Sequence, residues 1–106
     1  MQIIIQTLNF KPSDGLETFI NEKLAKIDHH SHGITRADVT LSKGPEAELN
    51  NNYCEIQLDM PGKKHFAKKS SDKFEHSITD AVEALLVMIA KDKDKEISKR
   101  HSEMPQ

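Results

Sequence analysis

Five lysines fall between Gly62 and Lys73, a stretch that contains a single acidic residue, Asp72. The preceding stretch, residues 44–60, carries four acidic residues and no lysine or arginine. Ammonium groups at this density can neutralise phosphates, so the stretch is a candidate for contact with nucleic acid. The same lysines also suit the solvated edge of a sheet, where charge prevents pairing with other chains.

Two other features invite a chemical interpretation. His29, His30 and His32 follow one another closely, but a metal site needs three or four convergent ligands, and neither a cysteine nor an acidic partner with ligand spacing accompanies them. Cys54 alternates in phase with Ile56 and Leu58, which predicts a buried side chain and not a nucleophile with a base beside it. We therefore expect no metal, no cofactor, no small-molecule substrate and no enzymatic activity.

Composition limits the class of protein. The chain has 106 residues, 36% of them hydrophobic and 30% charged, with a net charge of −2, which suits one small globular domain. No apolar run approaches the roughly 20 residues of a membrane span, and the first residues lack the basic segment of a secretory signal. The single cysteine rules out an internal disulfide, so we expect a cytoplasmic protein.

The elements that must position these residues follow from the apolar periodicity. Residues 2–8 are rich in β-branched side chains and predict a strand. Ser13 or Asp14 can cap a helix that ends near 30–33. The predicted stripe of this helix, with spacings of three and four residues, is Leu16, Phe19, Ile20, Leu24 and Ile27.

Three further strands and a second helix complete the chain. Residues 34–43, 53–60 and 63–70 alternate between apolar and polar, and Pro61-Gly62 predicts a turn between the last two strands. Asp72 and Glu75 suggest a capping box for a helix that runs to about Arg100. Its apolar stripe is predicted to be Phe74, Ile78, Ala81, Val82, Leu85 and Ile89.

The predicted fold is therefore α+β with the order β-α-β-β-β-α. Four strands form one sheet, and two amphipathic helices pack on one of its faces, leaving the other face open. We expect a single domain over residues 1–101 and a frayed tail over residues 102–106.

The sequence resembles a known family, the ribosome hibernation-promoting factors. These are also called ribosome-associated inhibitor A or S30AE-type ribosomal subunit interface proteins. The similarity covers about residues 1–97 and rests on the order and spacing of several short motifs. They are Ile3-Ile4-Ile5-Gln6, Phe19-Ile20, Lys23-Leu24, Lys26-Ile27-Asp28, Val39-Thr40-Leu41, Phe66-Ala67-Lys68, Phe74-Glu75, Asp80 to Leu85, Ile89, Lys91, Lys93 and Lys95.

The resemblance implies a fold akin to a double-stranded-RNA-binding domain and a role in silencing translation during stationary phase or stress. Such proteins bind the small ribosomal subunit in the channel for messenger and transfer RNA, and contact ribosomal RNA through basic side chains. The residues that this resemblance and the lysine-rich strand assign to RNA are Lys23, Lys26, Lys64, Lys68, Lys69, Lys91, Lys93 and Lys95. Such contacts read shape and phosphate more than base sequence.

One departure from the family pattern suggests an alternative function. Leu86, Val87, Met88 and Ala90 stand where the family usually has Arg, Lys or Gln, and Asp92 replaces a His or a cation. An exposed apolar helix face often marks a protein contact. The alternative hypothesis is therefore a protein-interaction module, with Leu86, Val87 and Met88 forming a homodimer contact.

Overall fold

A computed structural model describes the backbone of residues 1–31 and 33–103 and the side chains of residues 1–31 and 33–93. Its elements are β1 (Gln2–Leu8), α1 (Asp14–His30), β2 (Arg36–Lys43), β3 (Asn52–Met60), β4 (Lys63–Ser71) and α2 (Phe74–Glu103). The predicted α+β class, the element order and the single four-stranded sheet are confirmed. No helix in the described part of the chain is long and apolar enough to cross a membrane.

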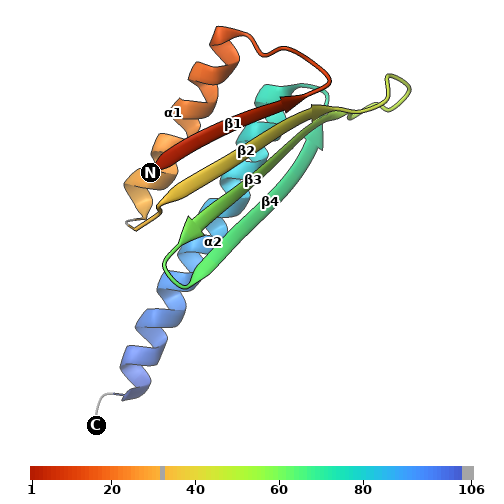
Figure 1. The fold of residues 1–106 in the computed structure, drawn as a ribbon. Coiled ribbons are helices and arrows are strands. Elements are labelled where there is room, and N and C mark those ends of the chain that lie inside the picture. The colour runs from red at the N-terminus through yellow and green to blue at the C-terminus, as the bar shows by residue number, and fades with distance from the viewer. Residues whose placement is uncertain (32, 104–106) are drawn as a thin grey trace.

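The sheet is mixed, with the strand order β1-β2-β3-β4 (Figure 1). The strands β2, β3 and β4 form an antiparallel meander, whereas β1 pairs with β2 in parallel. The parallel pair follows from the α1 crossover, which returns the chain to the end of the sheet where β1 begins. Both helices lie behind the sheet in Figure 1, so the opposite face is open, as predicted.

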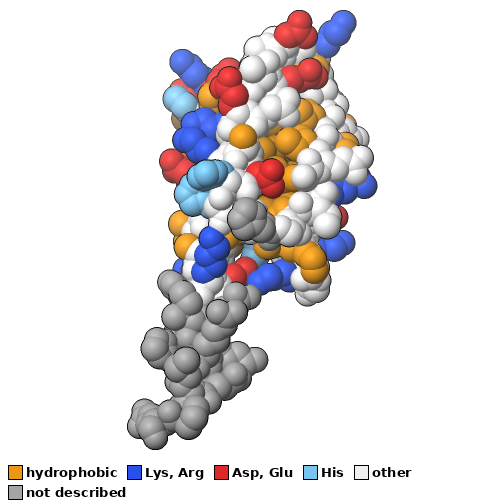
Figure 2. All heavy atoms as spheres, turned by 90° about the vertical axis from the view of Figure 1, so that its left-hand side faces the viewer, with side chains coloured by type: hydrophobic (Ala, Val, Ile, Leu, Met, Phe, Trp, Pro, Cys, Tyr) orange, Lys and Arg blue, Asp and Glu red, His pale blue; other side chains and the backbone are white. Residues whose placement is uncertain are grey.

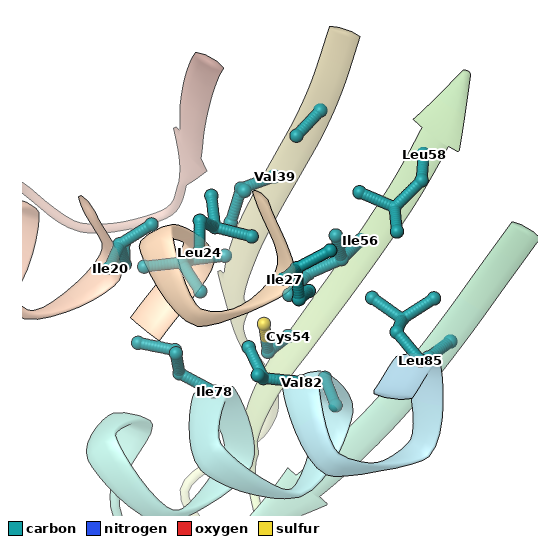
Figure 3. Close-up of a cluster of buried hydrophobic side chains, with 14 of the residues drawn as sticks. Ile20, Leu24, Ile27, Val39, Cys54, Ile56, Leu58, Ile78, Val82 and Leu85 are labelled. Carbon is teal, nitrogen blue, oxygen red and sulfur yellow. The ribbon is translucent and has the colours of Figure 1, made fainter. Parts of the chain in front are cut away.

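The core lies between the sheet and the two helices (Figure 3). Alternation along the strands turns Val39, Ile56 and Leu58 toward the helices, and each is at most 1% exposed. The α1 stripe meets them with Ile20, Leu24 and Ile27, which are fully buried, while Phe19 is only half-buried. From α2 the core takes Ile78, Ala81, Val82, Leu85 and Ile89.

Three local devices set the ends of the elements. The Ser13 hydroxyl accepts a hydrogen bond from the Leu16 backbone N–H at 3.2 Å, which confirms Ser13 as the cap of α1. Beyond α1, Gly33 adopts a φ of +92°, a left-handed conformation that glycine adopts without strain. Gly62 has a φ of +78° in the β3–β4 turn, where Pro61-Gly62 was expected to reverse the chain.

The second helix differs from the prediction at both ends. It begins at Phe74, and the Asp72 carboxylate bonds His76 at 3.0 Å, so the expected capping box with Glu75 does not form. The helix continues to Glu103 and extends well beyond the sheet (Figure 1). Ser102 and Glu103, which were expected in a frayed tail, are helical, and residues 104–106 of that tail lie outside the described part.

Candidate functional site

The open face of the sheet carries balanced charge. Arg36 and Asp38 form an ion pair at 2.8 Å, and Lys68 contacts Glu55 across β4 and β3 at 3.3 Å. Lys64 lies directly opposite Asp59 in the same register. Because each cation on this face has a carboxylate beside it or opposite it, the open face does not form a basic patch.

Tyr53 and Lys68 are held together on that face. The Lys68 ammonium lies 5.5 Å from the centre of the Tyr53 ring, within the range of a cation–π contact. The Tyr53 hydroxyl donates a hydrogen bond to the Glu48 carboxylate at 2.9 Å, and this bond raises the pKa of Tyr53. Tyr53 is therefore engaged within the protein, and no second aromatic ring lies within stacking range of it among the described residues.

The cations gather instead at the end of the molecule where α2 leaves the sheet. We call this end the basic pole and define it by Lys26, His30, Lys63, Lys64 and Lys93. Three elements build it: the last turn of α1, the start of β4 after the Pro61-Gly62 turn, and α2. Figure 2 shows Lys and Arg side chains around this end of the molecule.

A hollow of about 290 Å³ opens at this pole. Its lining residues come from the loop after α1, the β3–β4 turn and α2. They are Ser31, Gly33, Met60, Pro61, Lys63, Ile89, Asp92 and Lys93. A concave surface bordered by ammonium groups can receive a phosphate and the sugar attached to it.

Asp92 joins α2 to the start of β4. Its Oδ2 atom contacts His65 Nε2 at 2.5 Å and Lys63 Nζ at 3.1 Å. These hydrogen bonds, first that of His65 and then that of Lys63, hold the pKa of Asp92 below its ordinary value. The residue that replaces a cation of the family pattern thus has a structural partner, and it neutralises part of the charge of Lys63.

The end of α1 is tied to α2 at the same pole. The Lys93 ammonium donates a hydrogen bond to the backbone carbonyl of His30, which leaves the charge of Lys93 unpaired by any described carboxylate. His30 Nδ1 contacts the backbone carbonyl of Lys26 at 2.8 Å. His32 lies outside the described residues, and among those described no group of three potential ligands is placed to hold a metal ion.

The other residues assigned to RNA from the sequence lie elsewhere. The Lys23 ammonium sits 5.3 Å from the centre of the Phe19 ring on α1. Lys69 points to the helix side of β4, where it borders a hollow beside Asp80 and Glu83. Lys91 is exposed on α2, whereas the side chain of Lys95 lies outside the described residues. Of the predicted set, Lys26, Lys64 and Lys93 lie at the basic pole, Lys64 on the open face of the sheet and the other two on the helices.

The sequence placed Lys63 in the lysine-rich strand but did not assign Lys63, His65 or Arg36 to the candidate site. Lys63 and His65 acquire their position because α2 crosses the start of β4, a contact between residues 27 or more positions apart that no local pattern signals. Arg36 did carry a signal. Asp38 lies two residues farther along the same strand, so both side chains share a face and can pair.

The three residues of the alternative interaction hypothesis do not form one exposed face. Successive helical residues point about 100° apart. Val87 is 53% exposed, whereas Leu86 and Met88 are half-buried and pack against the core. Lys69, Asp80 and Glu83 border the hollow beside Val87, so its surroundings are largely charged. The self-association hypothesis therefore depends on Val87 and stays a prediction.

Cys54 is buried, as expected. It is fully inaccessible, and burial raises the pKa of its thiol to about 12, so the nucleophilic thiolate is scarce at neutral pH. Together with the balanced open face, this leaves the basic pole as the chemically distinctive surface of the described part. Cations at one end of a helix-backed sheet can contact phosphates even when the net charge of the chain is negative.

A comparison with known protein families identifies the family of the chain. A family model described as "Sigma 54 modulation protein / S30EA ribosomal protein" matches residues 3–97. Because the match spans most of the chain, the chain belongs to this family of ribosome-associated proteins, and the resemblance seen in its sequence is confirmed. No protein among those with curated descriptions matches the chain by sequence.

Solved structures share the fold. The N-terminal domain of Protein Y from Thermus thermophilus matches with a TM-score of 0.75 and 25% identity, over 86% of this chain and 98% of that one. A ribosomal subunit interface protein from Coxiella burnetii matches with a TM-score of 0.79 and 18% identity, over 89% of this chain and 99% of that one. The latter likeness bears on the fold alone.

Proposed function

We propose that this chain binds the small ribosomal subunit in the channel used by messenger and transfer RNA, and holds idle ribosomes inactive during stress or stationary phase. The family match over residues 3–97 carries the proposal, and the basic pole supplies its physical means. Binding of the folded domain excludes the RNA ligands by occupying their space. No bond is made or broken, and the protein acts in the cytoplasm, where ribosomes translate.

Within this proposal the lysines contact phosphates as point charges. Lys26 and Lys93 are the strongest candidates because no described carboxylate forms an ion pair with their ammonium groups. Lys64 also forms no described ion pair, although Asp59 lies opposite it in the sheet. Lys91 is a further exposed cation on α2. Lys23, Lys68 and Lys69 are expected to contribute less, because aromatic or acidic groups of the protein already engage or border them.

The test is co-sedimentation of the purified protein with small ribosomal subunits across a salt series. Each phosphate neutralised by a lysine should contribute a slope of about −0.7 to −0.9 to the dependence of log affinity on log salt. The double variant Lys64→Glu with Lys93→Glu should lose both contacts, so it should bind far more weakly and with a shallower slope.

A control of equal charge change separates the site from net charge. Lys11→Glu with Lys73→Glu makes the same change near the starts of α1 and α2, at the end of the molecule away from the basic pole. This variant should sediment nearly as the unmodified protein does. If both variants lost binding to the same extent, the basic pole would not be the contact site. If the unmodified protein failed to pellet with small subunits at low salt, the proposed function would be overturned.

A further inference from the structure

The two edges of the sheet are built differently. The edge strand β4 carries Lys63, Lys64, Lys68 and Lys69, a pattern that discourages pairing with another strand. The other edge strand, β1, has the sequence QIIIQTL and carries no charge. β1 also contains no proline. Neither lysine nor proline therefore discourages another strand from pairing with β1.

The hydrogen-bonding groups at the β1 edge can be assigned. The Gln2 backbone N–H donates to the Thr35 carbonyl at 3.0 Å, on the β2 side. In a parallel pair the backbone groups of one strand alternate between the two sides, so Ile4 and Gln6 also bond toward β2. The N–H and C=O groups of Ile3, Ile5 and Thr7 therefore point outward, and no described group hydrogen-bonds to them.

An apolar band lies beside this edge. Figure 2 looks onto the side on which α1 and β1 lie in Figure 1, and it shows hydrophobic side chains gathered along a shallow groove with acidic groups beside it. Ile3 and Ile5 face the helices but are only half-buried, since no further strand covers them. On the opposite face of the sheet Ile4 is half-buried and Leu8 is 43% exposed.

The charge near the groove comes from α1. The helix turns about 100° per residue, so Glu17, Asn21 and Asp28 share the flank away from Phe19 and Lys23. The helical hand and the position of α2 place this flank on the side of the free β1 edge. All three side chains are exposed, and neither carboxylate takes part in a described ion pair.

We propose that the groove between β1 and α1 binds an extended, basic segment of another protein, which adds a fifth strand to the sheet. The outward groups of Ile3, Ile5 and Thr7 would bond its backbone. Lysine or arginine stems at alternate positions would cover Ile3 and Ile5 and carry their charges toward Glu17 and Asp28. The positions between them would be apolar, next to Ile4 and Leu8.

Charge favours this occupant over two others. A second copy of the chain would bring an uncharged β1 and another acidic α1 flank, which leaves Glu17 and Asp28 without a cation. RNA would bring phosphates toward the same carboxylates and has no peptide groups with which to continue the ladder. The β1 edge is separate from the basic pole, so this proposal can be tested independently of ribosome binding.

The probe is a seven-residue synthetic peptide that alternates lysine with valine, added to the isotope-labelled protein. Amide hydrogen exchange is recorded by nuclear magnetic resonance. In the protein alone, the amides of Ile3, Ile5 and Thr7 should exchange fast and those of Ile4 and Gln6 slowly. The peptide should protect the first set selectively and saturably, whereas a peptide alternating glutamate with valine should not.

Two variants and a control make the test specific. Thr7→Pro removes an outward N–H without removing a β1–β2 bond, and should abolish peptide binding while the thermal unfolding curve stays cooperative. Asp28→Lys should lower the affinity for the lysine peptide by about fivefold to tenfold, as expected for reversing one exposed charge. Asp80→Lys, an equal change on α2, should leave the affinity unchanged.

Three outcomes would overturn the proposal. They are the absence of protection at about 1 mM peptide, equal protection by the glutamate peptide, and unchanged binding by the Thr7→Pro variant. Sedimentation of the protein alone would reveal a second copy: a dimer dissociated by Thr7→Pro would assign the edge to self-association instead. Protection of the same amides by a short single-stranded RNA would assign it to nucleic acid.

Discussion

Cys54 shows how burial decides the chemistry of a single residue. The thiol faces the helices from β3, with no exposed surface, and its pKa is raised to about 12 by desolvation and the nearby Glu55 charge. At pH 8 only about one thiol in ten thousand is then ionised in the folded protein. We expect a disulfide reagent to leave Cys54 unmodified in buffer and to react fully in concentrated urea.

The rate at which the reagent modifies Cys54 in increasing urea is the control for that prediction. As urea is added below the unfolding midpoint, modification should accelerate in step with the fraction of open molecules, because only these expose the thiol. Fast stoichiometric modification without denaturant would contradict the burial of Cys54. It would also remove the argument that the chain lacks an available nucleophile in its described part.

For single residues, the sequence predicted which side chains are buried better than it predicted which side chains pair. The alternation of residues 53–60 predicted that Cys54 faces the core, and this assignment is confirmed. It did not reveal that Lys68 meets Glu55, or that Asp92 holds His65 and Lys63. Those pairs depend on strand register and on the path of α2, which are set by the packing of the whole domain.

One such group of contacts joins α2 to β4. Asp92 is held below its ordinary pKa by hydrogen bonds from His65 and Lys63, so the folded state favours the charged carboxylate. A lowered pKa stabilises the fold above the pKa of the unfolded chain, about 3.9, and this stabilisation disappears as the pH falls through the folded value. Since the Asp92 side chain is 26% exposed, its contribution should not exceed about 1 kcal/mol.

Urea unfolding of the unmodified protein and of Asp92→Asn tests this contribution. At pH 7 the variant should be less stable by up to about 1 kcal/mol, and the difference should vanish near pH 3. Asp80→Asn, at an exposed carboxylate of α2 that takes part in no described ion pair, is the matched control. A difference between the unmodified protein and Asp92→Asn that persists unchanged at pH 3 would mean that the ion pair is not its cause.

Element order and faces could be predicted because each element carries its own periodicity. The stripe from Leu16 to Ile27 and the alternation of β2, β3 and β4 identify helices and strands without reference to one another. The start of α2 was predicted one residue too early, because Asp72 as the cap would make Lys73 the first helical residue, whereas α2 begins at Phe74. The Asp72 carboxylate bonds the His76 side chain, and the backbone N–H of Ser77 donates to the carbonyl of Lys73. The sequence alone does not decide which of these neighbouring groups pair.

On the scale of the whole molecule, charge is polarised along the strands. The end opposite the basic pole holds the starts of both helices and the β2–β3 loop. Its charged residues are three lysines and six carboxylates, namely Lys11, Lys43, Lys73, Asp14, Glu17, Glu46, Glu48, Asp72 and Glu75. A net charge of −2 therefore conceals a charge asymmetry that can turn the protein in the field of a polyanion.

This asymmetry predicts how the protein approaches RNA. Glu46→Lys with Glu48→Lys makes the far end cationic without touching the basic pole, so the protein loses its electrostatic preference for arriving pole first. We expect the variant to bind unstructured polyanions such as heparin more tightly at low salt, because it gains cationic charge. Its preference for small ribosomal subunits over heparin should fall, because binding in wrong orientations then competes with binding in the correct one. Competition sedimentation measures that ratio, and Glu46→Gln with Glu48→Gln should show a smaller shift in the same direction. A ratio unchanged by both variants would mean that shape alone, and not the charge asymmetry, orients the molecule.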